Sequence, residues 1–167
     1  MKTKVALGII LLIVAALQST WVPFWEIKGI MPNLPLILVV FVSLLKGEKY
    51  GAIMGMLTGL LMDFDSAKYI GLNMLSMLLV GFFVARTMER FYKANYIIPL
   101  TATAIGSLIY YASFLFFAFL ARAGIPFWQN LISYAIPATL YNMVLAMLLY
   151  VVIYLIFERV LKKNLFD

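Results

Sequence analysis

The sequence predicts an all-α membrane protein: a bundle of six transmembrane helices forming a single domain over residues 1–167. Two observations carry this prediction, namely the composition and the alternation of long apolar runs with short charged segments. Hydrophobic residues make up 65% of the 167 residues and charged residues 12%, whereas soluble chains have about 45–50% and about 25%. A chain of this length cannot hide so much apolar surface from water, and its mean hydropathy is +1.03.

This composition excludes soluble enzymes, nucleic-acid-binding proteins and disordered regulators, and makes the lipid bilayer the solvent of the protein. The net charge of +6 is assigned to cytoplasmic loops beside anionic lipid rather than to a nucleic-acid partner. The apolar runs predict membrane spans over residues 5–22, 33–45, 50–62, 70–85, 96–121 and 131–157.

The first run follows Lys2 and Lys4 and therefore resembles a signal peptide. Ala15 and Leu17 make a poor small-x-small cleavage site, and the apolar character continues to Trp21. Tryptophan is typical of the aromatic belt at a membrane interface. We therefore expect a first span that is retained in the mature protein.

The second and third runs are short for a membrane crossing. About 13 helical residues reach ~20 Å, against a hydrocarbon thickness of ~30 Å. A re-entrant hairpin is the alternative, but it would carry Lys46, Glu48 and Lys49 into the hydrocarbon at a cost of several kcal/mol. Two short spans with local thinning of the bilayer are favoured, and either arrangement gives the other spans the same orientation.

Basic residues are distributed unequally between the two sides of the predicted bundle. With the N-terminus inside, the inner segments hold ten of them and the outer loops three. The positive-inside rule then places both termini in the cytoplasm. The inner set is Lys2, Lys4, Lys46, Lys49, Arg86, Arg90, Lys93, Arg159, Lys162 and Lys163, and the outer set is Lys28, Lys68 and Arg122.

A glycine stripe runs along the third span, where Gly51, Gly55, Gly59 and Asp63 follow one another at a spacing of four residues. This spacing places the four residues on one face of a helix. Glycine allows another helix to approach closely, which is a main source of tight packing in lipid. The neighbour is either another helix of this chain or the membrane helix of a partner.

Asp63 is the acidic residue most closely tied to a span, and carboxylates in spans are candidates for function. It lies at a helix end, near the start of the fourth span at Gly71–Asn73. The favoured interpretation is that it accepts hydrogen bonds from the exposed N–H groups of that helix. A contact with a partner and an ion site are the alternatives.

Several polar residues are expected in the outer halves of spans four to six. They are predicted either to hydrogen-bond between helices or to line a small outward-facing pocket together with two tyrosines. These residues are Asn73, Ser76, Tyr110, Tyr111, Ser113, Thr139 and Asn142.

Some absences from the sequence also bear on function. The chain has no histidine and no cysteine, which removes imidazole and thiol chemistry and the usual metal ligands. No charged residue lies near the middle of a predicted span, and there is no phosphate-binding loop. We therefore expect no catalytic residue, no cofactor, no metal site and no proton- or ion-coupled transport.

Three segments resemble the family of the rod shape-determining membrane protein MreD. They are Pro32-Asn33-Leu34 at the start of the second span, the glycine stripe that ends at Asp63, and Gly71-Leu72-Asn73 with Gly81 in the fourth span. These motifs cover roughly residues 32–85. Position 33 is Asn where many members have Asp, which argues against a required charge there.

The resemblance implies a multi-pass protein of the bacterial cytoplasmic membrane that belongs to the elongation machinery, or elongasome. Such proteins are not enzymes; they bind the scaffold MreC and so help to couple MreB filaments to the peptidoglycan synthases of the lateral wall. The glycine stripe, Pro32–Asn33 and the Asp63/Asn73 corner would shape or form the groove for a membrane helix of MreC. A homo-oligomer is left open.

The family fold is expected to resemble the substrate-binding S-component of energy-coupling-factor vitamin transporters. This second resemblance supplies the alternative function, a small-molecule-binding subunit with its ligand in the outer pocket.

Overall fold

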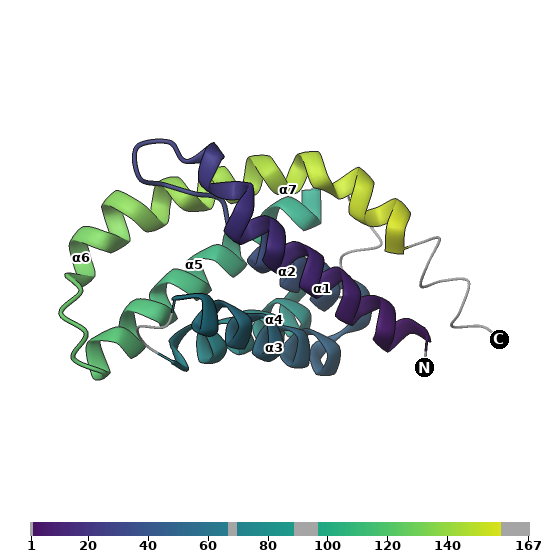
Figure 1. Cartoon of the computed structure of the whole chain (residues 1–167), viewed down its shortest axis with the longest axis horizontal. Helices are drawn as coiled ribbons and strands as arrows, with labels where there is room; N and C mark the ends of the chain where they lie inside the picture. Colours follow the sequence, from purple (N-terminus) through teal and green to yellow (C-terminus); the bar gives the residue numbers. More distant parts are fainter. Residues whose placement is uncertain (1, 67–69, 89–96, 158–167) are drawn as a thin grey trace.

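The structure is a computed structural model that describes residues 2–66, 70–88 and 97–157. The regular structure in these ranges is helical, apart from one isolated bridge between Ile27 and Ile30. The start of α1 and the end of α7 lie at the same end of the bundle (Figure 1). The elements are α1 (Lys2–Thr20), η1 (Val22–Trp25), α2 (Leu34–Lys46), α3 (Glu48–Ser66), α4 (Leu72–Met88), α5 (Ile97–Leu120), α6 (Phe127–Asn130), the π-helical turn η3 (Leu131–Ala135) and α7 (Ile136–Phe157).

Helix α2 lies at the centre of the bundle, because its sequence is apolar on every side. Residues 35–44 are all buried, as expected for a helix without a polar face. The helix packs against α1, α3, α4, α5 and α7. Asn33 caps its start, where the side-chain Oδ1 accepts a hydrogen bond from the N–H of Leu36 at 2.9 Å. Gly47 ends it with a φ of 82°, a conformation that favours glycine.

Two boundaries in this region differ from the predicted ones. The second and third predicted spans leave residues 46–49 between them as a charged turn. In the structure only Gly47 separates the two helices, because α2 ends at Lys46 and α3 begins at Glu48. Helix α3 also continues through Asp63 to Ser66, so the carboxylate lies in a helix rather than in a connecting loop. With 19 residues, α3 is about 28 Å long at 1.5 Å per residue. Of the two spans that were predicted to be short, α2 alone is short in the structure.

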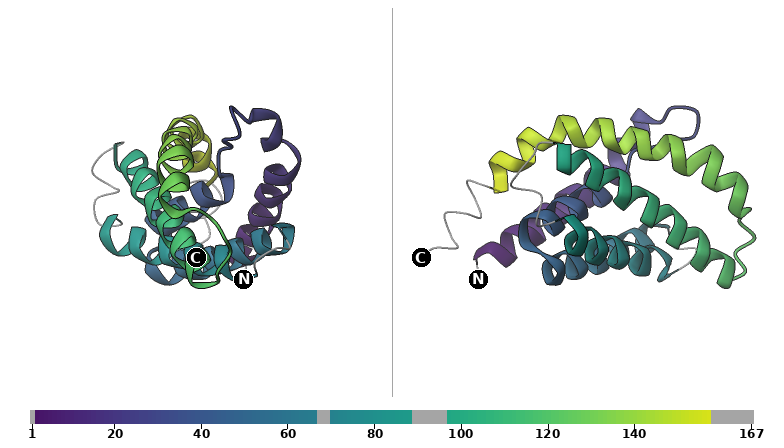
Figure 2. Two further views of the ribbon diagram at one scale, coloured as in Figure 1. Left: turned by 90° about the vertical axis from the view of Figure 1, so that its left-hand side faces the viewer. Right: turned by 180° about the vertical axis from the view of Figure 1, so that it is seen from behind.

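The α5–α7 pair is longer than the rest of the bundle and extends beyond it at one end (Figures 1 and 2). The 24 residues of α5 correspond to about 36 Å, against about 20 Å for the 13 residues of α2. The sixth predicted span starts too late, since helical structure begins at Phe127 and passes through η3 into α7. Pro137 has no N–H to donate to the preceding turn, which accounts for the π turn just before it.

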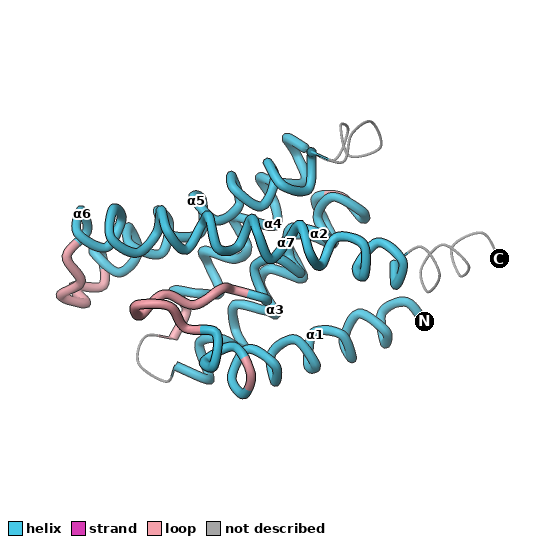
Figure 3. The backbone as a smooth tube through the Cα atoms, turned by 90° about the horizontal axis from the view of Figure 1, so that it is seen from above, coloured by secondary structure: helices cyan, strands magenta, loops and turns pink. Residues whose placement is uncertain are grey.

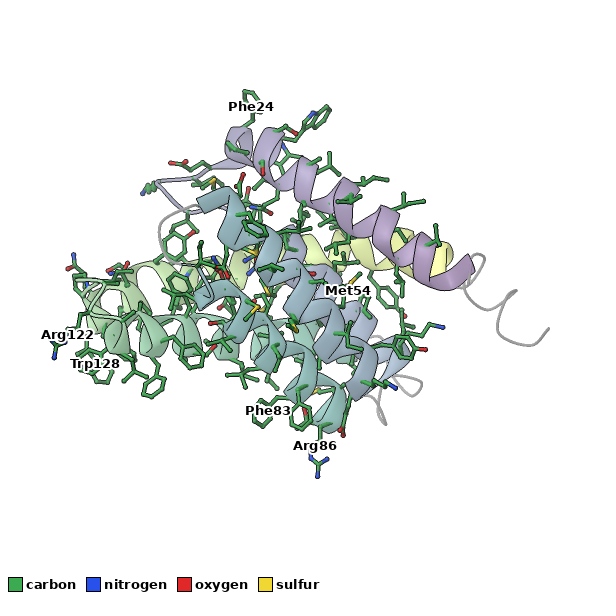
Figure 4. The ribbon with its side chains drawn as sticks, turned by 60° about the horizontal axis from the view of Figure 1, so that its bottom comes forward. Phe24, Met54, Phe83, Arg86, Arg122 and Trp128 are labelled. Carbon is green, nitrogen blue, oxygen red and sulfur yellow. The ribbon has the colours of Figure 1, made fainter. Side chains whose placement is uncertain are left out.

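Every long helix except the buried α2 exposes large apolar side chains on the outside of the bundle. Figure 4 shows Phe24, Phe83 and Trp128 pointing away from the helices; their exposed fractions are 86%, 43% and 72%. Contiguous exposed apolar surface of this extent indicates contact with lipid or with other proteins. Two stretches, Ile97–Leu120 and Phe127–Tyr150, are long and apolar enough to cross a membrane, and Val5–Thr20, Leu34–Lys46 and Leu72–Met88 are shorter apolar helices.

Few of the charges used for the topology prediction can be placed. Arg86 at the end of α4 forms an ion pair with Glu48 at the start of α3, with 3.2 Å between Nη1 and Oε1. This pair is exposed, so it contributes no more than about 1 kcal/mol. The predicted inner and outer residues Lys68, Arg90, Lys93, Arg159, Lys162 and Lys163 lie outside the described residues, as do the side chains of Lys2 and Lys4.

Candidate functional site

Asp63 caps the start of α4 with its side chain. Although it belongs to α3, its Oδ2 accepts hydrogen bonds from the N–H groups of Gly71 at 2.8 Å and Met74 at 3.0 Å. Its Oδ1 accepts one from the N–H of Asn73 at 3.0 Å. The first N–H groups of a helix have no partner within the helix, so the carboxylate satisfies one buried donor, that of Asn73, and two half-buried ones. The capping interpretation of Asp63 is therefore confirmed.

Asn73 connects this cap to α5. Its Nδ2 donates to Oδ1 of Asp63 at 3.0 Å, and its own Oδ1 accepts a hydrogen bond from the hydroxyl of Tyr110 at 2.5 Å. All three side chains are buried. A hydrogen-bonded chain therefore crosses three helices, from α5 through α4 to α3.

A second polar chain fixes the start of α2. The N–H of Asn33 donates to Oδ1 of Asn142 in α7 at 2.7 Å, and Nδ2 of Asn142 donates to Oγ of Ser107 in α5 at 3.1 Å. From α1, Gln18 donates to the carbonyl of Pro32 at 3.2 Å and accepts from the N–H of Leu34 at 2.9 Å. The backbone before α2 is thus held by side chains from α1 and α7.

Sequence reasoning missed Gln18 and Ser107. Gln18 is the only glutamine, asparagine or charged residue between Val5 and Thr20, and that isolation in an apolar run was the available signal. Ser107 had no such signal, because its partner Asn142 lies 35 residues away.

The glycine stripe of α3 faces α4 of the same chain. A methyl group on Gly55 would overlap the carbonyl group of Met77, and one on Gly59 would overlap the backbone of Asn73. Gly51 and Gly81 approach each other in the same way. The two backbones therefore pack without intervening side chains. In this conformation α4 occupies the glycine face, which is not open to a partner helix.

Only part of the predicted outer pocket forms a cavity. Tyr110 and Tyr111 line a cavity of about 310 Å³, together with Pro32 and Asn33. Ser76, Ser113, Thr139 and Asn142 do not line it. The hydroxyl groups of Ser76, Ser113 and Thr139 donate to carbonyls four residues earlier in their own helices. This is a common arrangement for serine and threonine in apolar helices. Asn142 belongs to the chain that fixes α2.

The side chains of Asp63, Asn73, Asn142 and Gln18 thus join helices. Asp63 already accepts four hydrogen bonds, and no group of three potential metal-ligating side chains occurs among the described residues. Gly71 contributes its backbone, with a φ of 102° between α3 and α4. This arrangement stabilises a particular packing of helices and exposes an apolar outer surface.

Such a molecule has the features of a helical membrane protein in which polar side chains position the helices, since two of its stretches are long and apolar enough to cross a membrane. The chain belongs to the family of the rod shape-determining protein MreD, whose family model matches residues 1–160. The resemblance found in the three sequence motifs is thereby confirmed. The family is a shape-determining structural component and is not known as an enzyme family.

No curated protein and no solved structure matches the chain. The likeness to the S-component of vitamin transporters gains no support from these comparisons and stays a prediction from sequence.

Proposed function

We propose that this protein is a multi-pass component of the bacterial cytoplasmic membrane that acts in rod shape determination by binding MreC. Through MreC it would take part in the elongation machinery, which couples MreB filaments to peptidoglycan synthases. Membership of the MreD family supports the role in rod shape. Five apolar stretches, two of them long enough to cross a membrane, support a multi-pass bundle in which α3 would be the sixth span. The common end of α1 and α7 supports an even number of spans with both termini on one side, which we take to be the cytoplasm.

The outward face of α1 is the surface that we assign to MreC. This helix lies along one edge of the bundle (Figures 2 and 3) and packs against α2, α3 and η1. Its outward residues include Val5, Ile9 and Leu12, which are 58%, 53% and 62% exposed. No charged residue occurs between Val5 and Thr20, so this face suits the membrane helix of a bitopic scaffold.

The open space around Gly8 favours α1 over the other helices as the binding surface for MreC. The five other glycines inside helices, at positions 51, 55, 59, 81 and 106, all have a close neighbour that a methyl group would meet, whereas Gly8 has nothing within 4 Å. Glycine in a helix costs about 0.5–1 kcal/mol relative to alanine, and in lipid it serves close helix approach. No described part of this chain makes such an approach at Gly8, so we assign it to the membrane helix of MreC. Ala16, also exposed, lies eight residues further along the same face.

The motif residues have a supporting role in this proposal. Asp63, Asn73 and the glycines of α3 hold the α3–α4 pair, and Asn33 positions α2, against which α1 packs. Their replacement would weaken MreC binding through loss of the bundle rather than through loss of a direct contact.

Replacement of Gly8 by leucine separates these two effects. Because Gly8 has open space around it, Gly8→Leu should leave the detergent-solubilised protein with unchanged thermal stability. It should nevertheless lower the amount of MreC that co-purifies with the protein several-fold. The matched control is Ala112→Leu on the exposed face of α5, which should retain MreC. Full retention of MreC by Gly8→Leu would exclude the α1 face.

A further inference from the structure

The cavity of about 310 Å³ lies where the short helix α2 begins beside the long helix α5. Gln18 at the end of α1 and Asn33 at the start of α2 line one side. Tyr111 and Leu115 of α5 and Tyr134 of the π turn η3 also line the cavity. Its volume falls at the lower end of the range for small-molecule sites, about 300–1,000 Å³.

The chemistry of the wall selects an uncharged and largely apolar occupant. No carboxylate, lysine or arginine is among the described residues that line the cavity. A charged group would lose its hydration there without a compensating charge. Met31, Met62, Phe114 and Ile125 supply hydrocarbon and aromatic surface, which suits an alkyl chain.

Hydrogen-bonding capacity remains at one end of the wall. Gln18 uses both ends of its amide on the backbone around Pro32, but Asn130 donates only one hydrogen bond, from Nδ2 to the carbonyl of Pro126 at 2.9 Å. Its Oδ1 has no partner among the described contacts, and because Asn130 is half-exposed this oxygen is accessible. A neutral hydroxyl group on a ligand would satisfy that oxygen.

A π turn forms the part of the cavity wall that follows Asn130 in the chain. Tyr134 and Ala135, both in η3, line the cavity. Single π turns are rare and occur mostly at functional sites. The distortion of the helix before Pro137 therefore shapes the cavity, which is an observation independent of its volume.

The position of the cavity along α5 indicates how a ligand would lie in it. Tyr110 lies 13 residues after Ile97, or about 20 Å along the axis, and Leu120 lies about 15 Å further on. If α5 crosses the bilayer, Tyr110 to Leu115 therefore lie at the depth of the hydrocarbon, whereas Ile125 and Asn130, beyond the end of α5, lie nearer the interface. A molecule with an alkyl chain for the deep part and a polar head for the outer part matches this placement.

We propose that this cavity binds an uncharged amphiphile from the lipid phase, with its alkyl chain along Phe114 and Leu115 and a neutral hydroxyl head at Asn130. The site is separate from the α1 face assigned to MreC, so either proposal can fail without the other.

Three probes with the same chain length test the selection by charge. The purified full-length protein in maltoside detergent is heated with 1-oleoylglycerol, with oleate or with oleylamine. A ligand that binds only the folded state raises the unfolding midpoint by mass action. We expect a saturable rise with 1-oleoylglycerol and little with the two charged probes. Equal shifts with all three, or a shift with a charged probe alone, would overturn the proposal.

Two tryptophan variants test the location. Ile125→Trp fills the cavity, so the ligand should bind less tightly. The half-saturating concentration of 1-oleoylglycerol should rise about tenfold or more, and the unfolding midpoint should rise less at a given concentration. Ile132→Trp is the control, since Ile132 is 62% exposed and does not line the cavity. An unchanged response of Ile125→Trp would contradict the assignment.

A labelling experiment covers the case in which Ile125→Trp does not fold. A monoacylglycerol with a photoreactive diazirine near the end of its chain is crosslinked to the wild-type protein, and the labelled peptides are sequenced. Labels should appear at the lining residues Tyr110, Tyr111, Phe114 or Leu115, along which the alkyl chain lies. Labels confined to exposed lipid-facing residues such as Phe116 or Leu148 would overturn the proposal.

Discussion

Asp63 accepts two hydrogen bonds from the same residue, Asn73, one from its backbone N–H and one from its side-chain Nδ2, both at 3.0 Å. The backbone bond caps α4, and the side-chain bond leaves Oδ1 of Asn73 in place to receive the hydroxyl of Tyr110. One carboxylate therefore fixes the turn between α3 and α4 and also orients the amide that connects these helices to α5.

Asp63→Ala should strongly destabilise the bundle. It would leave the buried N–H group of Asn73 and the half-buried N–H groups of Gly71 and Met74 without their acceptor. A fully buried unsatisfied group costs about 1–3 kcal/mol, and a half-buried one costs less because water can reach it. We expect a loss of about 2–4 kcal/mol, measured by reversible unfolding in mixed micelles. Asp63→Asn keeps one acceptor oxygen and should lie between Asp63→Ala and wild type.

Asp65 provides the matched control for this experiment. It is exposed on the same last turn of α3, so Asp65→Ala should change stability by less than about 0.5 kcal/mol. Equal losses for the two alanine variants would show that the cap does not stabilise the bundle.

Alanine at Gly55 and at Gly8 should have opposite effects. Alanine is intrinsically better than glycine in a helix by about 0.5–1 kcal/mol, and Gly8 has free space for the methyl group. Gly8→Ala should therefore be neutral or slightly stabilising. At Gly55 the methyl group would push α3 away from Met77 of α4, and such overpacking costs about 1–3 kcal/mol. Thermal midpoints of the two purified variants decide this, and a destabilisation of the same size in both would contradict the assigned packing.

The hydrogen bond between Tyr110 and Asn73 should appear as a coupling energy. Tyr110→Phe, Asn73→Ala and the double variant form a cycle in which the interaction term should be about 0.5–1.5 kcal/mol. Tyr50→Phe is a control for loss of a hydroxyl, because Tyr50 is 42% exposed. A coupling energy of zero would mean that the two groups do not interact in solution.

Thr58→Val should be neutral or stabilising, in contrast to most changes in a buried position. Thr58 is 1% exposed, and its hydroxyl has no hydrogen-bond partner among the described residues. Valine has a similar shape and removes the cost of that buried polar group. Unfolding of the purified variant measures the change, and a loss of more than about 1 kcal/mol would show that the hydroxyl has a partner.

The sequence predicted the helices well, because charged residues, glycine or proline separate each long apolar run from the next. It also predicted the cap by Asp63, since the carboxylate and Gly71–Asn73 are close in the chain. The choice between an internal and an external neighbour for Gly55 could not be made, because small residues serve both kinds of packing equally. The contact of Asn33 with Asn142 spans 109 positions, and local patterns carry no information about such pairs.

The pocket was predicted too broadly for a related reason. Ser76, Ser113 and Thr139 satisfy their own hydroxyl groups on the helix backbone, so they need no shared cavity. The π turn before Pro137 was likewise not apparent, because proline near a helix start usually causes no distortion.

The central claim is that the glycines of α3 pack internally while the outward face of α1 meets MreC. Because the chain has no cysteine, single cysteines can be introduced at exposed apolar positions on separate helices, with Leu12 on α1 and Phe83, Phe116 and Leu148 on α4, α5 and α7. Each variant is expressed with MreC carrying single cysteines along its membrane helix, and disulfide formation is scored in native membranes. Crosslinks should form at Leu12 and not at the other three positions. Crosslinks at Phe83, Phe116 or Leu148 without any at Leu12 would contradict the claim.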